Sequence, residues 1–320
     1  MATSTHTFQG VQFIEIRADQ AGQRIDNFLI TLEKGIPKSR IYRALRSGEV
    51  RVNKGRVKQT YRLQTGDLVR IPPLKVSEKV VITELSDSLS RALEQSILFE
   101  DDAMLVINKP SGLAVHAGSQ IQLGVIEAMR IMRSENPFLE LVHRLDRDTS
   151  GCLILAKSRA ALLNLQQQMR QAETDKRYLT LTKGHWLSQQ NIVELALQKN
   201  TLTAGERMVV PDINGKPSKT LFEVKQTFND CQLVIAKLFT GRTHQIRVHS
   251  ASQAHPVAGD EKYGDRAFNK QLRQHGLKRL FLHAWQLSFH HPITSKRVTF
   301  QAELPESLAQ VVNQLEKSYA

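Results

Sequence analysis

The sequence predicts an α+β protein in which a small N-terminal domain precedes a larger domain, a mixed, mainly antiparallel β-sheet flanked by helices. Its 320 residues leave room for about two domains. A hydrophobic content of 41% and a charged content of 23% are typical of a globular protein with a substantial core. In the second part of the chain, strand patterns dominate and helical patterns lie between them. We expect a first domain over residues 12–75, a linker over 76–95 and a second domain over 96–320.

The chain is strongly basic, with a formal net charge of +13 and a sequence pI of about 9.8. Residues 1–75 contain 14 Lys and Arg against 6 Asp and Glu, so a net charge of +8 lies in less than a quarter of the chain. Such a concentration favours a polyanionic partner, through counterion release and electrostatic steering. The alternative is a generic basic surface that maintains solubility, and the location of the charge decides between the two.

In the first domain, helices are predicted at residues 24–34 and 38–46, each with one apolar face, and short strands at 11–16, 50–52 and 68–71. The second helix crowds its remaining surface with basic side chains, which can grip phosphates. These candidate RNA-binding residues are Lys38, Arg40, Arg43 and Arg46. A compact basic domain that binds another protein is the alternative interpretation.

The second domain is predicted mainly as strands. A hairpin pattern occupies residues 97–107, helical patterns occupy 124–133 and the segment after Ser158, and a last helix follows Pro305. Further strands are predicted at 152–156, 176–181, 218–225, 232–238, 280–289 and 297–302.

One polar stretch, residues 141–151, lies between apolar segments that are typical of core. Unpaired charges are costly to bury, so the stretch is a candidate site with Asp146 in it. The alternative is a polar turn whose side chains bond their own backbone, and composition does not separate the two. Asp146 and Asp148 also raise the possibility of a glycosidase carboxylate pair. A second dense stretch, residues 240–249, predicts a helix that Thr243 caps and on which His244 and Arg247 share a face.

The histidines, 11 in number, raise the question of a metal site. No His-Glu-x-x-His or similar spacing occurs, and although His143 and Asp146 could share a ligand set, no third ligand stands out. There is no glycine-rich phosphate loop, so nucleotide hydrolysis has no support. We therefore expect no metal and no other cofactor.

Cys152 and Cys231 provide neither a disulfide framework nor a zinc pattern, and a reduced, cytoplasmic setting is the simplest interpretation. No apolar stretch approaches membrane-spanning length, and residues 1–10 carry no hydrophobic signal segment. We expect no membrane partner. No oligomerisation signal is visible, so a monomer is expected.

Three motifs in the second domain resemble those of the RluA family of RNA pseudouridine synthases. They are His143-Arg144-Leu145-Asp146-x-x-Thr149-Ser150-Gly151, the Lys-x-Tyr pattern that ends at Tyr178, and Gly241-Arg242-Thr243-His244-Gln245-Ile246-Arg247-Val248-His249. In the first domain, residues 22–26 and 48–53 resemble the S4-like RNA-binding domain. The resemblance covers about residues 12–315, and the stretch 186–216 is the part for which it says least.

The resemblance implies conversion of uridine to pseudouridine after base flipping, with no cofactor. It implies that Asp146 is the nucleophile or charge stabiliser, attacking either C1′ of the ribose or C6 of the uracil. It further implies that Arg247 orients Asp146, and that Tyr178 stacks on the base and helps to remove the C5 proton. Arg144 would take the space of the flipped base, and the substrate would also contact His143, Arg242 and His244. Lys109, in a Lys-Pro-x-Gly stretch, would have a supporting role.

The same resemblance favours 23S (large-subunit) ribosomal RNA, or a pre-50S particle, as the partner. Two alternatives stay open: a pseudouridine synthase that acts on tRNA or another rRNA site, and a non-catalytic RNA-binding factor for ribosome assembly. The second alternative predicts loss of one of the three catalytic residues, and Asp146, Tyr178 and Arg247 are all present.

Overall fold

The computed structural model describes residues 10–33, 36–74, 84–117, 123–136, 138–201 and 207–319. The chain divides into two compact units, Met1–Val81 and Ile82–Ala320. Each unit has its own hydrophobic core, so the α+β organisation with a small first unit is confirmed.

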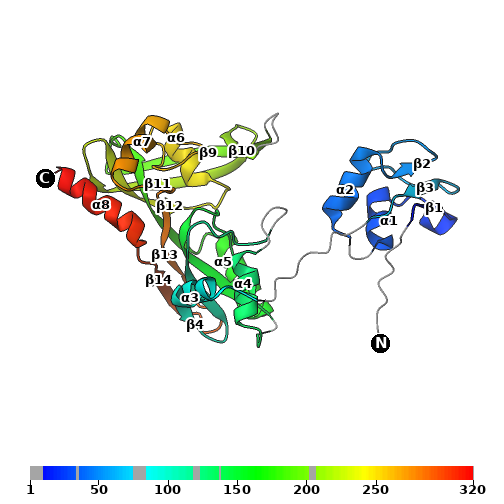
Figure 1. The fold of residues 1–320 in the computed structure, drawn as a ribbon, viewed down its shortest axis with the longest axis horizontal. Coiled ribbons are helices and arrows are strands. Elements are labelled where there is room, and N and C mark those ends of the chain that lie inside the picture. Colours follow the sequence, from blue (N-terminus) through cyan, green and yellow to red (C-terminus); the bar gives the residue numbers. More distant parts are fainter. Residues whose placement is uncertain are drawn as a thin grey trace. The chain divides into compact units, whose positions relative to one another are not determined.

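The N-terminal unit packs two helices against a three-stranded antiparallel sheet (Figure 1). Its apolar residues cluster because each helix buries one face, as Ile25 and Leu29 do on the first helix and Ile41 and Leu45 on the second. The strand order is β1-β3-β2. The elements are β1 (Gln12–Glu15), a 3-10 turn (Ala18–Gln20), α1 (Ile25–Leu32), α2 (Lys38–Ser47), β2 (Arg51–Val52) and β3 (Leu68–Ile71).

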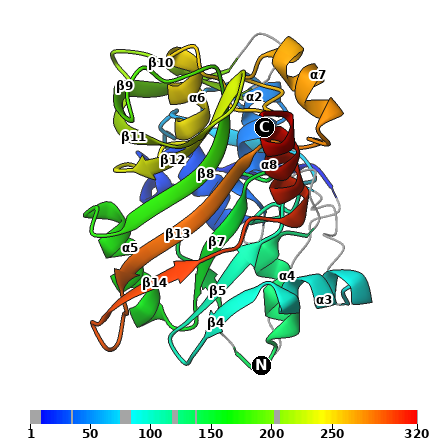
Figure 2. The same cartoon turned by 90° about the vertical axis from the view of Figure 1, so that its left-hand side faces the viewer.

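The second unit is built on an 11-stranded sheet in the order β10-β9-β11-β12-β8-β13-β7-β5-β4, with β14 beside β13 and β6 beside β7. Figure 2 shows the central strands side by side. Among the described strands, β13 and β7 pair in parallel and the other neighbours are antiparallel. The strands are β4 (Ile97–Glu100), β5 (Met104–Lys109), β6 (Glu140–Leu141), β7 (Ser150–Ala156), β8 (Asp175–Lys183), β9 (Gln190–Thr201), β10 (Arg207–Pro211), β11 (Lys216–Thr227), β12 (Cys231–Leu238), β13 (Leu282–His290) and β14 (Arg297–Gln301).

Helices cover both faces of this sheet, which explains the continuous apolar run of β7. Leu153 and Leu155 pack with one set of helices, whereas Cys152 and Ile154 belong to the cluster on the other side. The helices are α3 (Asp87–Gln95), α4 (Val125–Met132), α5 (Arg159–Arg170), α6 (Gln245–Ser252), α7 (Arg266–Gln274) and α8 (Glu306–Tyr319). The first two share a cluster with β5 and β7, α5 lies on the other side of those strands, and α7 and α8 pack on β8 and β12.

The predicted linker, residues 76–95, differs from the structure in its second half. Residues 75–83 lie outside the described residues, but α3 begins at Asp87 and its Leu93 is fully buried in the core of the second unit. Ser86 caps this helix, accepting a hydrogen bond from the backbone N–H of Leu89 at 3.3 Å. We propose that the second domain begins with α3 rather than at Ser96. The other predicted domain limits stay a proposal.

Gly151 is the second residue of β7 and lies where β7 pairs in parallel with β13. Its φ is +111°, and a Cβ at this position would lie 2.2 Å from the carbonyl oxygen of Ala284. Only glycine combines that backbone conformation with so close an approach. The close strand contact fixes the end of the loop that carries Asp146.

We expect Gly151→Ala to destabilise the second unit by about 3 kcal/mol or more, because the added methyl group meets backbone that cannot move aside. Gly276→Ala is the matched control. Gly276 has a φ of +83° but no atom within 4 Å of the added Cβ, so it carries only the conformational cost of about 1–2 kcal/mol. Urea unfolding of both variants measures the difference, and equal losses would contradict the role given to the β7–β13 contact.

Candidate active site

Asp146 lies in the loop between β6 and β7, and Lys109 holds that loop from beneath. The Lys109 side chain is fully buried. Its Nζ donates to the carbonyl oxygens of Pro110 and Leu113, both at 2.8 Å, and of Arg147 at 3.1 Å. Burial lowers the pKa of Lys109 to about 7, while three carbonyl acceptors match the three donors of an ammonium group. Lys109 therefore joins the Lys-Pro-x-Gly turn to the Asp146 loop.

A second anchor reaches the loop from β13 and the segment just before it. Arg279 Nη2 donates to the Ser150 hydroxyl at 2.8 Å and to the carbonyl of Asp148 at 3.2 Å. His283 Nε2 lies 3.1 Å from the carbonyl of Ala302, which can only accept, so Nε2 carries the proton. Nδ1 then accepts from the Ser150 hydroxyl, 2.9 Å away. Because each group has a defined donor or acceptor role, the loop is rigidly positioned at its C-terminal end.

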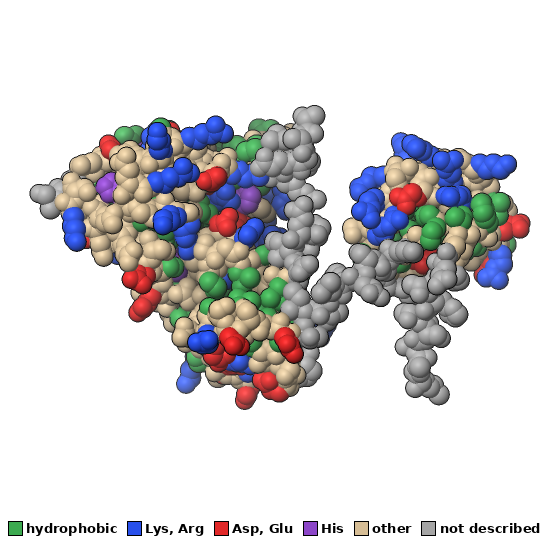
Figure 3. Space-filling model, in the orientation of Figure 1, with side chains coloured by type: hydrophobic (Ala, Val, Ile, Leu, Met, Phe, Trp, Pro, Cys, Tyr) green, Lys and Arg blue, Asp and Glu red, His purple; other side chains and the backbone are tan. Residues whose placement is uncertain are grey.

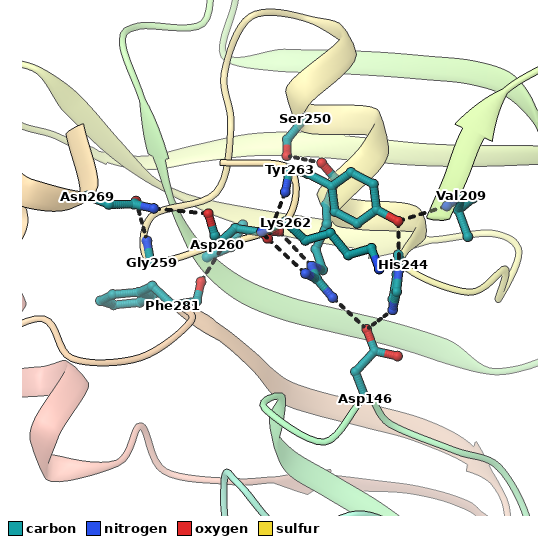
Figure 4. Close-up of polar contacts among 12 residues, drawn as sticks. Asp146, Val209, His244, Ser250, Gly259, Asp260, Lys262, Tyr263, Asn269 and Phe281 are labelled. Atoms are coloured by element: carbon teal, nitrogen blue, oxygen red, sulfur yellow. Dashed lines mark hydrogen bonds and ion pairs between the residues drawn. The ribbon is translucent and has the colours of Figure 1, made fainter. Parts of the chain in front are cut away.

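The Asp146 carboxylate is partly exposed and faces two basic side chains from the start of α6 (Figure 4). Its Oδ2 lies 3.5 Å from Arg247 Nη1 and 3.7 Å from His244 Nε2. The side chain of Asp146 is 23% exposed, whereas that of Arg247 is 12% exposed. A carboxylate in this position keeps an accessible oxygen while a cation stabilises its charge.

Arg247 has a stronger partner than Asp146. Its Nε and Nη2 donate to Asp260 at 2.6 and 2.8 Å, a bidentate pair with a carboxylate of 0% exposure. Asp260 also accepts from the backbone N–H groups of Lys262 and Tyr263 at 2.8 and 3.0 Å. Burial alone would raise the pKa of Asp260, but the bonds and charge of Arg247 outweigh burial and lower it. The pair fixes the guanidinium plane, so that Nη1 points at Asp146.

His244 is held in turn by Tyr263. The Tyr263 hydroxyl accepts from the backbone N–H of Val209 at 2.9 Å and lies 2.8 Å from His244 Nδ1. When the hydroxyl donates to Nδ1, the proton of the neutral imidazole is on Nε2, the nitrogen that faces Asp146. Burial lowers the pKa of His244, which favours the neutral ring. His244 adopts a left-handed conformation with a φ of 53°, an unusual state for a residue other than glycine.

A pocket opens above Asp146. Tyr178 from β8 and Leu238 from β12 form part of its wall, together with the loop before α6. Burial, and secondarily the charge of Asp146, raises the pKa of Tyr178, so its phenol stays protonated at neutral pH. The lining residues are Arg144, Leu145, Asp146, Thr149, Tyr178, Leu238, Gly241, Arg242, Thr243, His244, Gln245, Ile246 and Leu282.

Comparison with known proteins identifies the family of this chain. Residues 103–252 match the family model described as RNA pseudouridylate synthase, and residues 23–69 match the S4 domain. The chain is 51% identical over 310 residues to "Ribosomal large subunit pseudouridine synthase C" of Haemophilus influenzae, covering 96% of each chain. It is also 51% identical over 309 residues to the protein of the same name from Escherichia coli (strain K12), covering 95% of this chain and 97% of that one. The chain belongs to the RNA pseudouridylate synthase family.

Solved structures support the assignment of the fold. "Human RNA Pseudouridylate Synthase Domain Containing 4" matches with a TM-score of 0.60 and 26% identity, over 72% of this chain and 96% of that chain. The predicted resemblances to an RluA-type synthase and to an S4 domain are thus confirmed.

The structure brings most of the predicted site residues of this pseudouridylate synthase together. Arg144, Tyr178, Arg242 and His244 line the pocket with Asp146, and Arg247 contacts Asp146 from behind. The catalytic and binding roles given to these residues remain predictions.

Two predictions about the site differ from the structure. His143 is not among the pocket-lining residues: its Nε2 accepts from the backbone N–H of Ile154 at 3.2 Å, which ties the ring to β7. Burial lowers the pKa of His143 to about 4, in keeping with that acceptor role. Thr243 does not cap α6, because the helix begins after His244 and Gln245 Oε1 accepts from the backbone N–H of Arg242 at 2.9 Å.

Sequence reasoning missed Asp260, Tyr263, Arg279 and His283. Asp260 and Tyr263 follow Arg247 at separations with no helical or strand period, and Arg279 lies 129 residues from its partner Ser150. No local pattern marks them.

In the N-terminal unit, Lys and Arg gather over the side that holds α2 (Figure 3). Arg43 and Arg46 are exposed, and Arg46 lines a groove with Arg56 and Lys58. Arg40 differs from its neighbours, since its Nη2 pairs with Glu49 at 2.7 Å and its side chain is only 18% exposed. Lys38 is exposed at the start of the helix. Arg40 therefore supports the fold of the unit, and the exposed cations are the better candidates for contact with RNA.

Within the described residues, no cluster of three or more His, Cys, Asp or Glu side chains could hold a metal ion. No described helix has both the length and the apolar character that a membrane crossing requires.

We expect Asp260→Asn to destabilise the protein by about 3–5 kcal/mol at pH 7, because the charge of Arg247 stays buried without its partner. The folded-state pKa of Asp260 is lowered, so its contribution is complete above the ordinary carboxyl pKa and is lost as the pH falls below about 4. The gap between wild type and variant should shrink over that range. Urea unfolding at several pH values measures it.

Asp265→Asn is the matched control for this experiment. Asp265 caps α7 and pairs with Lys183 at 2.6 Å with 32% of its side chain exposed, so its loss should cost about 1 kcal/mol or less. A loss for Asp260→Asn no larger than for Asp265→Asn, or one that does not change with pH, would contradict the importance of the buried pair.

Proposed function

We propose that this protein isomerises uridines to pseudouridine in 23S (large-subunit) ribosomal RNA. The observation that carries the proposal is the accessible carboxylate of Asp146 in a pocket beside a cation that a second, buried carboxylate holds in place. Relatives at about half identity over nearly the whole chain, which are named for the large ribosomal subunit, support the choice of RNA.

The reaction breaks the N1–C1′ glycosidic bond, turns the uracil and joins its C5 to C1′. The C5 proton leaves and N1 gains a proton, so atoms and electrons balance without an oxidant or a cofactor. Asp146 supplies the negative charge that either attacks C1′ or C6 or stabilises the charge that develops when the bond breaks. Arg247 orients this carboxylate through Nη1, while its other donors remain with Asp260.

Tyr178 contributes its ring rather than a base. Its aromatic face offers a stacking surface for the uracil in the pocket. No described residue forms a hydrogen bond with its hydroxyl, which leaves that group free for the substrate. Because the phenol stays protonated at neutral pH, it is a poor acceptor for the C5 proton. The stacking part of its predicted role is therefore favoured over proton removal.

The remaining pocket residues bind the nucleotide. A target base must leave its stack to reach Asp146, which costs a few kcal/mol. Arg144 is exposed at the pocket and fills the space that the target base leaves in the RNA stack when it flips. Arg242 is exposed at the rim and offers its terminal nitrogens to phosphate, since its Nε is already bonded to the carbonyl of Pro217 at 3.1 Å. The His244 ring faces both Asp146 and the pocket.

The S4-like unit supplies RNA affinity through Arg43, Arg46 and their neighbours. A pre-50S particle as the natural partner, a monomeric state and a cytoplasmic location complete the proposal. A pseudouridine map of large-subunit RNA from cells lacking the protein would test the choice of substrate. An unchanged map would point to tRNA or to a non-catalytic role in ribosome assembly.

Asp146→Asn should reduce the rate of pseudouridine formation by about 1,000-fold or more, because the amide keeps the shape of the side chain but removes the nucleophile. RNA binding should be retained. Release of tritium from 5-tritiated uridine in 23S RNA measures the reaction, because the C5 hydrogen is lost only on isomerisation. Asp148→Asn is the control, since the hydrogen bonds that Asp148 accepts from Ser111 and Arg279 go to its backbone carbonyl, which the substitution keeps. Wild-type turnover by Asp146→Asn, or equal losses in both variants, would refute the assignment.

Arg43→Ala/Arg46→Ala should weaken RNA binding and reduce the slope of log affinity against log salt by roughly 1.4–1.8, the value for two phosphate contacts. Arg40→Ala should leave that slope nearly unchanged and lower the stability of the N-terminal unit, since Glu49 loses its partner. Filter binding at several salt concentrations measures the slope. An unchanged slope in the double variant would move the RNA contact to another surface.

A further inference from the structure

A second groove adjoins the candidate active site in the same unit. It lies between β9, β10 and the turn before β11, and its wall includes Lys199, Val209 and Lys216. Residues 241–243 line both this groove and the pocket above Asp146. The two hollows are therefore neighbours across a single short loop.

The groove presents three cations without carboxylate partners among the described residues. Lys199, Lys216 and Arg242 are exposed. Other lysines on the same sheet are paired: Lys219 with Glu194 at 2.6 Å and Lys237 with Asp175 at 3.3 Å. Unpaired cations along a hollow favour an extended polyanion over a neutral ligand.

The surface charges of the second unit as a whole also favour the binding of a polyanion. On the face shown in Figure 3, Asp and Glu gather at the end that holds α3 and β4, and Lys and Arg are more frequent at the opposite end, over α6 and α7. A polyanion would be steered toward the latter end.

Gly241 lies on the loop between the two hollows. Its φ is outside the left-handed region, and a Cβ built there would meet no atom within 4 Å. Neither backbone conformation nor internal packing therefore requires glycine at this position. Residues 241–243 form the ridge between the pocket and the groove, which we call the crest. Because Gly241 has no side chain, a ligand that approaches from outside can cross the crest there.

The floor of the groove is also connected to the site chemistry. The backbone N–H of Val209, which lines the groove, donates to Tyr263, and Tyr263 contacts His244 beside Asp146. A ligand bound along β10 would thus contact the strand that holds Tyr263, and through it the ring that faces the carboxylate.

We infer that this groove binds the single-stranded nucleotides that flank the target uridine. The inference rests on the proposed function and deepens it. A flipped uridine stays covalently joined to its neighbours, so the strand must leave the pocket across its rim. The crest at Gly241 is an open exit, and the phosphates beyond it reach Lys199, Lys216 and Arg242.

The test couples changes in the protein to changes in the RNA. Lys199→Ala/Lys216→Ala is compared with wild type on three fragments of 23S RNA, cut from one segment that the wild type binds and that holds a single unpaired uridine. One fragment has both flanks of the uridine, one has the 5′ flank cut to one nucleotide and one has the 3′ flank cut. The variant should bind the full fragment about tenfold more weakly and lose roughly 1.4 from its salt slope. It should bind one of the cut fragments as wild type does, because the lost contact is then absent from both.

Lys296→Ala/Lys317→Ala removes the same charge from exposed positions outside the groove, in the turn before β14 and on α8. This control should respond to truncation as wild type does. If the Lys199→Ala/Lys216→Ala variant bound all three fragments more weakly by the same factor, or if both double variants behaved alike, the groove would not be the binding site of the flanking nucleotides.

Gly241→Val provides a test that does not change charge. The variant should melt at the wild-type temperature, since the space at Gly241 is open, and lose about tenfold or more in kcat/KM on the full fragment. A folded Gly241→Val protein with the wild-type kcat/KM would contradict the inference that the RNA strand crosses the loop at Gly241. Absence of turnover by the wild type would refute the proposed function, whereas the binding data on the cut fragments test the groove by themselves.

Discussion

The buried ion pair between Arg247 and Asp260 is the interaction on which the candidate site depends. Removing two charges from water is costly, and only close geometry with additional hydrogen bonds offsets that cost. Asp260 meets this condition with two bonds from the guanidinium and two from backbone N–H groups. Since these bonds fix both the first turn of α6 and the segment that follows it, the position of Arg247 is determined by the fold before any substrate binds.

The unequal distances around Arg247 have a chemical consequence. Asp260 is bound at 2.6 Å, whereas Asp146 Oδ2 is 3.5 Å away. Because Asp260 balances most of the charge of Arg247, Asp146 is attracted and oriented without being held in a close pair. A nucleophile bound as tightly as Asp260 would have to break that pair before it could react. The arrangement thus separates a structural carboxylate, Asp260, from the proposed nucleophile, Asp146, around the same guanidinium.

Much of the site could be predicted because its signals are local. The charged loop between two core segments made Asp146 a candidate, and the dense stretch 240–249 did the same for Arg247 and His244. The roles predicted for these residues came from the resemblance of the motifs to those of a known family. The partners that hold these groups could not be predicted, because Asp260, Arg279 and His283 meet them only through tertiary contacts that leave no period in the sequence. His143 and Arg40 are affected by the same lack of local signal. Each is of a residue type that often contacts a ligand, but in the structure His143 accepts a hydrogen bond from the backbone N–H of Ile154, and Arg40 pairs with Glu49.

The proposed isomerisation, which balances without a cofactor, places particular demands on positioning. Lys109, Arg279 and Ser150 hold the Asp146 loop from two sides, so the flexible participant is the RNA, whose target base must leave its stack at a cost of a few kcal/mol. Phosphate contacts can offset that cost only if they form together with the flipped state. Under the two proposals made above, cations in the S4-like unit would hold RNA whether or not a base is flipped. Those beside Gly241 would contact the strand only where it enters the pocket, so they are the ones able to favour the flipped base over the stacked one.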